Sequence, residues 1–291
     1  MSDIVKNNNV KDSSAKEITQ KSKTNFLYSF SLLPKEKNEA INTVYAFCRY
    51  TDDIVDNDDD TKDIRFTKIR EWRNEFERAL SGNSSYPLLN QLNKVIKKFS
   101  IPIEPFFELI KGMESDLQVS RYKDFETLYQ YCFRAAATVG LMCIEVFGYK
   151  TPSAKQYAVN LGIAMQLTNI LRDIKYDALN GRIYIPAEDL RRFGYTEEDL
   201  LNFKYNESFV ELMKFECKRT HEYFEKANNN FSKEDRKLLF PARIMQKIYF
   251  NILEKIEKMN YNVFLKKAKV SKVKKIYYTL GVFVKYKLAF R

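Results

Sequence analysis

Hydrophobic positions recur every three or four residues along most of the chain, which is the period of an α-helix with one buried face. After Pro34, for example, Ala40, Val44, Phe47 and Val55 fall on one side of a helix, and the acidic run that follows ends it. No segment alternates with the two-residue period of a strand. The pattern therefore predicts an all-α fold, with helices over residues 35–55, 64–80, 88–99, 104–119, 124–147, 152–178, 206–229, 232–258 and 271–288.

Short turn signals separate these helices, among them Gly148-Tyr149 and Asn180-Gly181. With only 8 Gly and 7 Pro in 291 residues, the chain has few helix breakers, which favours long helices. No internal repeat or long linker divides it. We therefore predict a flexible N-terminal segment over 1–16 and one all-α domain over 17–291, built as a helix bundle around a central cavity.

The net charge of +11 is concentrated at the C-terminus. Segment 266–291 contains eight Lys and one Arg and neither Asp nor Glu, and its aromatic residues alternate with the lysines. A basic, aromatic helix of this kind can lie on an anionic membrane surface or can pack as an ordinary solvated helix, and the sequence leaves both open. No nucleic-acid-binding motif accompanies the charge, so nucleic acid is not expected as a partner.

The four cysteines are scattered without a CxxC pair, and the single histidine, His221, stands in a charged helix. These features argue against a zinc site and against a His-based catalytic triad. The polar N-terminus lacks the apolar region of a secretory signal, and no run of about eighteen apolar residues is present. We expect a cytoplasmic protein, with peripheral contact to the inner face of the membrane as the open question.

Two of the predicted helices carry aspartates one helical turn apart. They are Asp52, Asp53 and Asp56 in the first helix and Asp173 and Asp177 in the second. Each helix points two carboxylates in one direction, and both lie in apolar sequence, where clustered anions need a counter-charge. Mg²⁺ shared with a phosphate would supply it through oxygen ligands. Arg49, one turn before Asp53, adds a fork of donors suited to phosphate oxygens.

The second motif is denser than the first. Gln166, Asn169, Asp173 and Asp177 follow a 3-4-4 spacing and share one face of the helix, with Arg172 beside them. A purely structural helix rarely carries two amides and two acids on one stripe. The motif therefore indicates a diphosphate-binding metal site between facing helices.

These residues resemble the head-to-head prenyl synthases, the family of squalene, dehydrosqualene and phytoene synthases. The resemblance extends over about residues 18–275. It is carried by Leu161-Gly162-x-x-x-Gln166-x-x-Asn169-Ile170-x-Arg172-Asp173-Ile174-x-x-Asp177-x4-Arg182-x-Tyr184-x-Pro186 and by Tyr131-Cys132-Phe133-Arg134-Ala135-Ala136-Ala137-Thr138-Val139-Gly140.

The resemblance implies a helical isoprenoid-synthase fold and a role for each matching position. It implies that Mg²⁺, in three ions, is held by Asp52, Asp56, Asn169, Asp173 and Asp177. It implies that the substrates contact Phe26, Arg49, Tyr131, Asn169, Arg172, Tyr249 and Lys267. Of these, it assigns the reacting centre to Tyr131, Arg49 and Arg172.

The implied reaction is 1′-1 coupling of two identical prenyl diphosphates with loss of pyrophosphate. The stretch from Phe47 to Asp56 is most similar to bacterial enzymes that make presqualene diphosphate from two farnesyl diphosphates, with squalene or dehydrosqualene as later products. Phytoene synthesis from two geranylgeranyl diphosphates is the alternative. A non-catalytic, membrane-associated helical scaffold is a remote one. Use of NADPH, the final product and the oligomeric state stay open.

Overall fold

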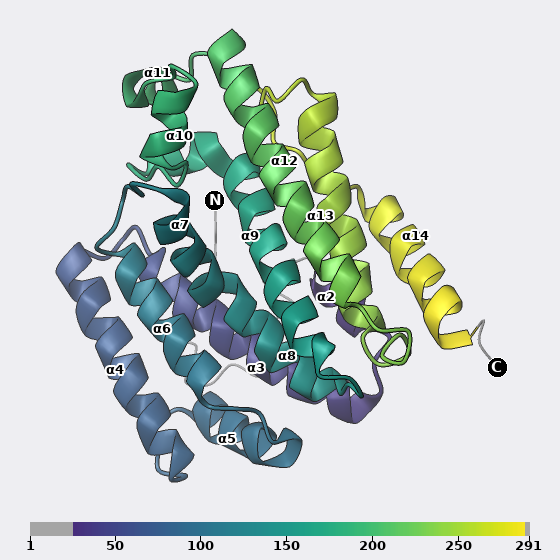
Figure 1. Ribbon diagram of the computed structural model, residues 1–291. Coiled ribbons are helices and arrows are strands. Elements are labelled where there is room, and N and C mark those ends of the chain that lie inside the picture. Colours follow the sequence, from purple (N-terminus) through teal and green to yellow (C-terminus); the bar gives the residue numbers. More distant parts are fainter. Residues whose placement is uncertain (1–25, 289–291) are drawn as a thin grey trace.

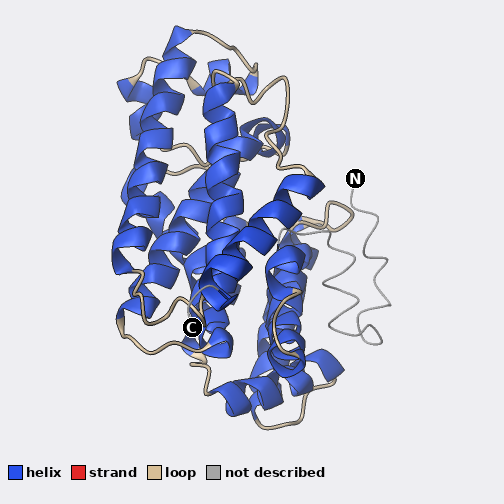
Figure 2. Cartoon of the chain, turned by 90° about the vertical axis from the view of Figure 1, so that its right-hand side faces the viewer, coloured by secondary structure: helices blue, strands red, loops and turns tan. Residues whose placement is uncertain are grey.

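The structure is a computed structural model that describes residues 26–288, with side chains over 27–286; this part is helical, without strands (Figures 1 and 2). The all-α prediction is thus confirmed. The helices are α2 (Phe26–Phe30), α3 (Lys35–Val55), α4 (Lys62–Leu80), α5 (Pro87–Phe99), α6 (Glu104–Asp116), α7 (Phe125–Cys132), η1 (Phe133–Ala137), α8 (Thr138–Phe147), α9 (Ser153–Leu179), α10 (Ala187–Arg192), α11 (Glu197–Leu201), α12 (Glu207–Asn230), α13 (Phe240–Lys258), α14 (Lys272–Phe283) and η2 (Val284–Leu288).

The long helix α9 lies at the centre of the bundle (Figure 1). It packs against α12, α13, α8 and η1, while α3 packs against α4, α5, α6 and α8. Large side chains such as Trp72, Tyr157 and Phe209 are buried in the interior. The two helices predicted to carry the acid motifs, α3 and α9, therefore lie on either side of one interior.

One long predicted helix contains a change of winding. Residues 125–147 run as α7, then the π-helical turn η1, then α8. The wider turn presses against α9 at Gly162, where an added Cβ would lie 2.6 Å from Cα of Ala137. Only a residue without a side chain fits there, so Gly162 sets how closely the two helices approach.

One predicted helix was wrong at its start. We expected a helix over 232–258, but α13 begins at Phe240. Pro241 is tolerated only in the first turn of a helix, because it lacks the N–H that later positions donate. The preceding turn is held instead by buried Asp235, which accepts hydrogen bonds from the backbone N–H of Lys150 and the hydroxyl of Thr151.

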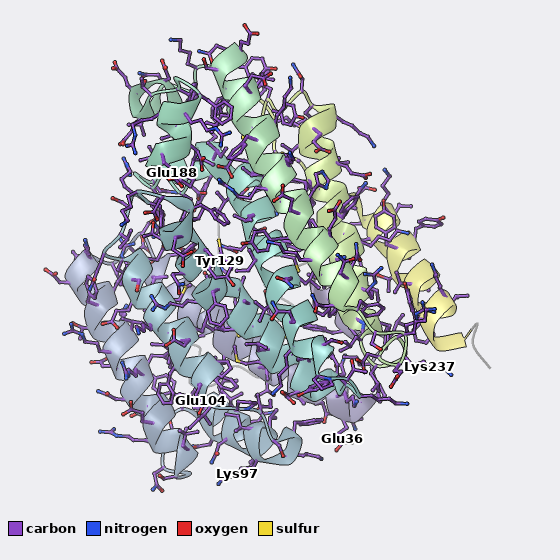
Figure 3. All side chains as sticks on the ribbon, viewed as in Figure 1. Glu36, Lys97, Glu104, Tyr129, Glu188 and Lys237 are labelled. Atoms are coloured by element: carbon purple, nitrogen blue, oxygen red, sulfur yellow. The ribbon has the colours of Figure 1, made fainter. Side chains whose placement is uncertain are left out.

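Short helices α2, α10 and α11 fall outside the predicted ranges. Helix α10 is attached to α7: Glu188, labelled in Figure 3 above Tyr129 of α7, accepts a hydrogen bond from the backbone N–H of Phe125 at 2.8 Å. Within the described residues no helix is long and apolar enough to cross a membrane.

Candidate active site

A cavity of about 440 Å³ lies between α3, α8, α9 and α13. One end is polar and the other apolar, because each helix contributes polar side chains at one end only. At the polar end the lining residues are Arg49, Asp52, Gln166, Asn169, Arg172 and Tyr249. From Ala158 to Arg172 on α9 the wall extends over about 21 Å, at a helical rise of ~1.5 Å per residue.

The first acid motif lies at the C-terminal end of α3. Arg49 forms an ion pair with Asp52 at 3.1 Å and also pairs with Asp53. Asp52 lines the cavity. Asp53 pairs with an arginine of its own helix and does not line the cavity.

The second motif lies on the last turns of α9. The Nε of Arg172 donates to Asp173 at 3.0 Å, and Lys267 reaches the same carboxylate at 2.6 Å. Burial raises the pKa of Asp173, but these two cations lower it more, so it stays below its usual range. Asp177, one turn further on, stands near Asp173 and Arg182.

Arg182 joins the two motifs. After α9, Gly181 adopts a positive φ of 74°, which returns the chain so that the N–H of Arg182 donates to the carbonyl of Asp177 at 2.8 Å. The guanidinium then lies 3.1 Å from Asp56 of α3 and 3.2 Å from Asp116 of α6. The loop after α9 thus brings the acids of α3, α6 and α9 into one electrostatic cluster.

This cluster holds more negative charge than its arginines neutralise. Burial, reinforced by Asp56, raises the pKa of Asp52 to about 7 against the opposing effect of Arg49. Burial and then Asp173 raise the pKa of Asp177 to about 7. Carboxylates in this state are stabilised by a further cation.

The donor set fits Mg²⁺. All candidate ligands are oxygens, and Oδ1 of Asn169 is buried at the cavity without a hydrogen-bond partner, while its amide nitrogen donates to Gln166 at 3.2 Å. Within residues 26–288, no three His, Cys, Asp or Glu side chains converge closely enough to hold one ion. Oxygens of a bound diphosphate and water would therefore have to complete each coordination shell, as is usual for Mg²⁺.

Two of the predicted substrate residues lie outside the cavity lining, and a third falls outside the described side chains. Tyr131 does not line the cavity; its ring stacks on Tyr184 at 5.1 Å, and the two hydroxyls are 3.5 Å apart. Lys267 pairs with Asp173 outside the cavity wall. The side chain of Phe26 lies outside the described residues. The structure brings Arg49, Asn169, Arg172 and Tyr249 together at the polar end of the cavity.

Sequence reasoning missed Asp116. This carboxylate is only 4 % exposed, pairs with Arg182, and accepts a hydrogen bond from the Tyr184 hydroxyl at 2.8 Å. Burial raises its pKa to about 6, although Arg182 and Tyr184 oppose the effect. A lone acid at the end of an apolar helical pattern was the available signal. Arg182 and Tyr184 were visible in the motif without an assigned role.

Aromatic rings line the apolar end of the cavity. Phe30 of α2 lies 6.4 Å from Tyr45 of α3 and 6.3 Å from Phe147 of α8, measured between ring centroids. All three line the cavity at the end remote from Arg172. The shape suits an amphiphile with an anionic head and a long hydrocarbon tail.

Known proteins are similar to this chain in both sequence and fold. The squalene/phytoene synthase family model matches residues 19–274. The 15-cis-phytoene synthase of Synechococcus elongatus is 35 % identical, with 90 % of this chain and 88 % of that protein covered. The 15-cis-phytoene synthase of Synechocystis sp. is 38 % identical, with 90 % and 81 % covered.

Solved structures agree with these matches. A dehydrosqualene synthase in complex with ligand superposes with a TM-score of 0.82 at 30 % identity, covering 94 % of this chain and 95 % of its own. The squalene synthase HpnC from Alicyclobacillus acidocaldarius gives 0.79 at 26 % identity, covering 85 % and 93 %. With the family model matching most of its length, the chain belongs to the squalene/phytoene synthase family, whose members are prenyltransferases that join two prenyl diphosphates head to head.

Proposed function

We propose that this chain condenses two geranylgeranyl diphosphates to phytoene in a Mg²⁺-dependent reaction that releases pyrophosphate. The observation that carries the proposal is the cavity, in which an apolar wall ends at Arg49, Asp52 and Arg172, with Asp173 hydrogen-bonded to Arg172 just behind it. The phytoene synthases among the relatives support the C20 substrate. We had expected farnesyl diphosphate first; those relatives favour the alternative.

Arg49 and Arg172 would bind diphosphate oxygens at the polar end, since both line the cavity and present guanidinium groups that can make paired hydrogen bonds. Asp52, Asp56, Asn169, Asp173 and Asp177 would hold the metal. Mg²⁺ bound there would stabilise the negative charge of the departing pyrophosphate as a Lewis acid.

The apolar wall would protect the allylic cation left behind. Leu161, Val139 and Ile144 line the cavity beyond the polar end, and their hydrocarbon side chains present no nucleophile. Excluding water from this region prevents hydrolysis of a reactive intermediate. The tails of the two substrates would occupy the same apolar space.

Farnesyl diphosphate is the second candidate. The rings of Phe30, Tyr45 and Phe147 favour a shorter chain, because each ring takes up volume at the apolar end of the cavity. Similarity to a dehydrosqualene synthase structure points the same way.

Product analysis separates these possibilities. Purified protein with Mg²⁺ would receive radiolabelled geranylgeranyl or farnesyl diphosphate, each with and without NADPH, and both pyrophosphate and hydrocarbons would be measured. Phytoene from the C20 substrate, with slower turnover of the C15 substrate, is the expected result. A preference for the C15 substrate would establish the second candidate. If neither substrate releases pyrophosphate, the non-catalytic scaffold is the remaining interpretation.

A further inference from the structure

The exposed hydrophobic side chains are unevenly distributed. Every large hydrophobic side chain that is at least half exposed in the described part of the chain belongs to two segments, 176–179 and 265–284. They are Tyr176, Leu179, Leu265, Val273, Ile276, Tyr277, Leu280 and Val284. Leu265 is 85 % exposed and Val273 77 %, far beyond what ordinary packing leaves in water.

Helix α14 is apolar on two faces. Its inner face, with Thr279 and Val282 buried, packs against α13. Its outer face carries Val273, Tyr277 and Leu280, spaced three to four residues apart, so they form one stripe along the helix. The helix lies at the outer edge of the bundle in Figure 1 and at the front in Figure 2. The stripe itself is exposed.

The second exposed segment adjoins the first. The Nζ of Lys175 on α9 donates to the carbonyl of Phe264 at 2.8 Å, directly before Leu265. Lys267 pairs with Asp173 of the same helix end. The exposed residues Tyr176 and Leu179 therefore lie on the turn of α9 to which the 264–267 segment is tied.

Lysines surround this apolar surface. Segment 265–286 contains seven Lys and neither Asp nor Glu. Lys272 and Lys274 are exposed on α14 itself. Tyr277 combines an apolar ring with a polar hydroxyl, a combination that suits the boundary between lipid and water.

We infer that the outer face of α14, with Leu265 and the end of α9, docks on an anionic phospholipid bilayer. The hydrophobic side chains suit the boundary of the acyl chains, and the flanking lysines suit the negatively charged headgroups. A second copy of the chain fits less well, because two identical lysine-rich faces repel each other. With no membrane-crossing helix in the described residues, the contact is peripheral.

The docking would turn the Asp173 end of α9 towards the bilayer. For an enzyme of hydrophobic substrates and products, a point that rests on the proposed function, this orientation shortens the path between lipid and cavity. The binding itself needs no substrate and is tested without one.

The first experiment is co-sedimentation of the full-length chain with vesicles. One set contains phosphatidylcholine alone, and the other contains equal parts of phosphatidylcholine and phosphatidylglycerol. We expect sedimentation with the anionic vesicles only, and progressive loss as NaCl is added, because salt screens the headgroup charge.

Two sets of substitutions separate the apolar and charged contributions. The first is a triple variant that keeps every lysine: Val273→Ser, Tyr277→Ser and Leu280→Ser. It should lower the vesicle partition coefficient at least tenfold. Lys272→Gln with Lys274→Gln keeps the stripe and should lower it roughly 30-fold at low salt. The control is Ile64→Ser, which alters an exposed hydrophobic residue on α4 and should leave the partition coefficient unchanged. Circular dichroism confirms that each variant folds.

A fluorescence reporter tests the position directly. Trp72 is buried and is the sole native tryptophan, so Tyr277→Trp adds one exposed indole. Its emission should shift to shorter wavelength with anionic vesicles. Sedimentation unaffected by the stripe substitutions would overturn the inference. A dimer in light scattering that the same substitutions abolish, with no vesicle binding, would show that a second copy covers the face.

Discussion

Arg182 lies 3.1 Å from Asp56, although 126 positions separate the two residues in the sequence. The same guanidinium lies 3.2 Å from Asp116. One arginine from the loop after α9 thus fixes the distance between the acid-bearing ends of α3 and α6. The backbone N–H of Arg182 also donates to the carbonyl of Asp177, so the same residue connects the end of α9 to these two acids.

Replacing Arg182 with Gln should destabilise the fold by about 3 kcal/mol near pH 8, since it leaves buried Asp116 ionised and unpaired. The loss should be smaller at pH 5. The pKa of Asp116 is about 6 even with Arg182 present and would rise further without it, so the carboxyl is protonated and neutral at the lower pH.

Urea unfolding at the two pH values measures this difference. The double variant Arg182→Gln, Asp116→Asn should regain part of the lost free energy of unfolding at pH 8, because the unpaired charge of Asp116 is gone. Equal destabilisation at both pH values would show that Arg182 acts through packing alone.

Asp52→Asn or Asp173→Asn should lower pyrophosphate release more than about 100-fold, as expected when a metal ligand is removed. Asp58→Asn is the matched control, since Asp58 is an exposed acid in the loop just after α3. It should retain wild-type turnover. Near-normal activity of either motif variant, with helicity unchanged by circular dichroism, would remove that residue from the proposed metal site.

Stabilisation by Mg²⁺ and pyrophosphate should increase with pH. Asp52 and Asp177 have pKa values of about 7 in the folded chain, well above the usual aspartate value, so the folded state alone loses stability as pH rises from about 4 to 7. Above pH 7 the carboxylates are free of protons and can bind metal.

The rise in Tm on adding Mg²⁺ with pyrophosphate should therefore be larger at pH 8 than at pH 6. Pyrophosphate itself titrates in this pH range, so the wild-type protein is compared with the double variant Asp52→Asn, Asp177→Asn. In the double variant, the rise in Tm should differ less between pH 6 and pH 8 than it does in the wild-type protein. An identical pH dependence in both proteins would exclude these carboxylates as the cause.

Phe30→Ala should shift substrate preference towards longer prenyl chains, because it opens the apolar end of the cavity. The ratio of turnover with C20 and C15 diphosphates measures the shift. Stability should fall by about 3–5 kcal/mol. Leu92→Ala is the control: Leu92 is buried away from the cavity, so it costs stability without changing the ratio.

Gly162→Ala should destabilise the protein by about 1–3 kcal/mol, because the new methyl group would meet the backbone of η1 at 2.6 Å. Gly281→Ala makes the same chemical change in α14, where nothing lies within 4 Å, and should stabilise its helix by about 0.5–1 kcal/mol. Chemical unfolding of both variants tests the pair. A neutral Gly162→Ala would mean that α9 can move away from η1.

Some features were readable from local pattern and others were not. The start of α13 was predictable from Pro241, whose missing N–H restricts it to a first turn, and we misplaced it by following hydrophobic spacing alone. The π-helical turn η1 had no such local signal. Its winding depends on how α9 and α6 press on it, at Gly162 and Gly112.

The sequence by itself determined the helices, the two acid motifs and the family, because helical period and i to i+4 spacing are properties of neighbouring residues. The tertiary structure alone decided that Arg182 reaches Asp56 and Asp116, that Tyr131 stacks on Tyr184 away from the cavity wall, and that three aromatic rings line the apolar end. These relationships join residues far apart in the chain. They depend on how whole helices pack, which no local pattern encodes.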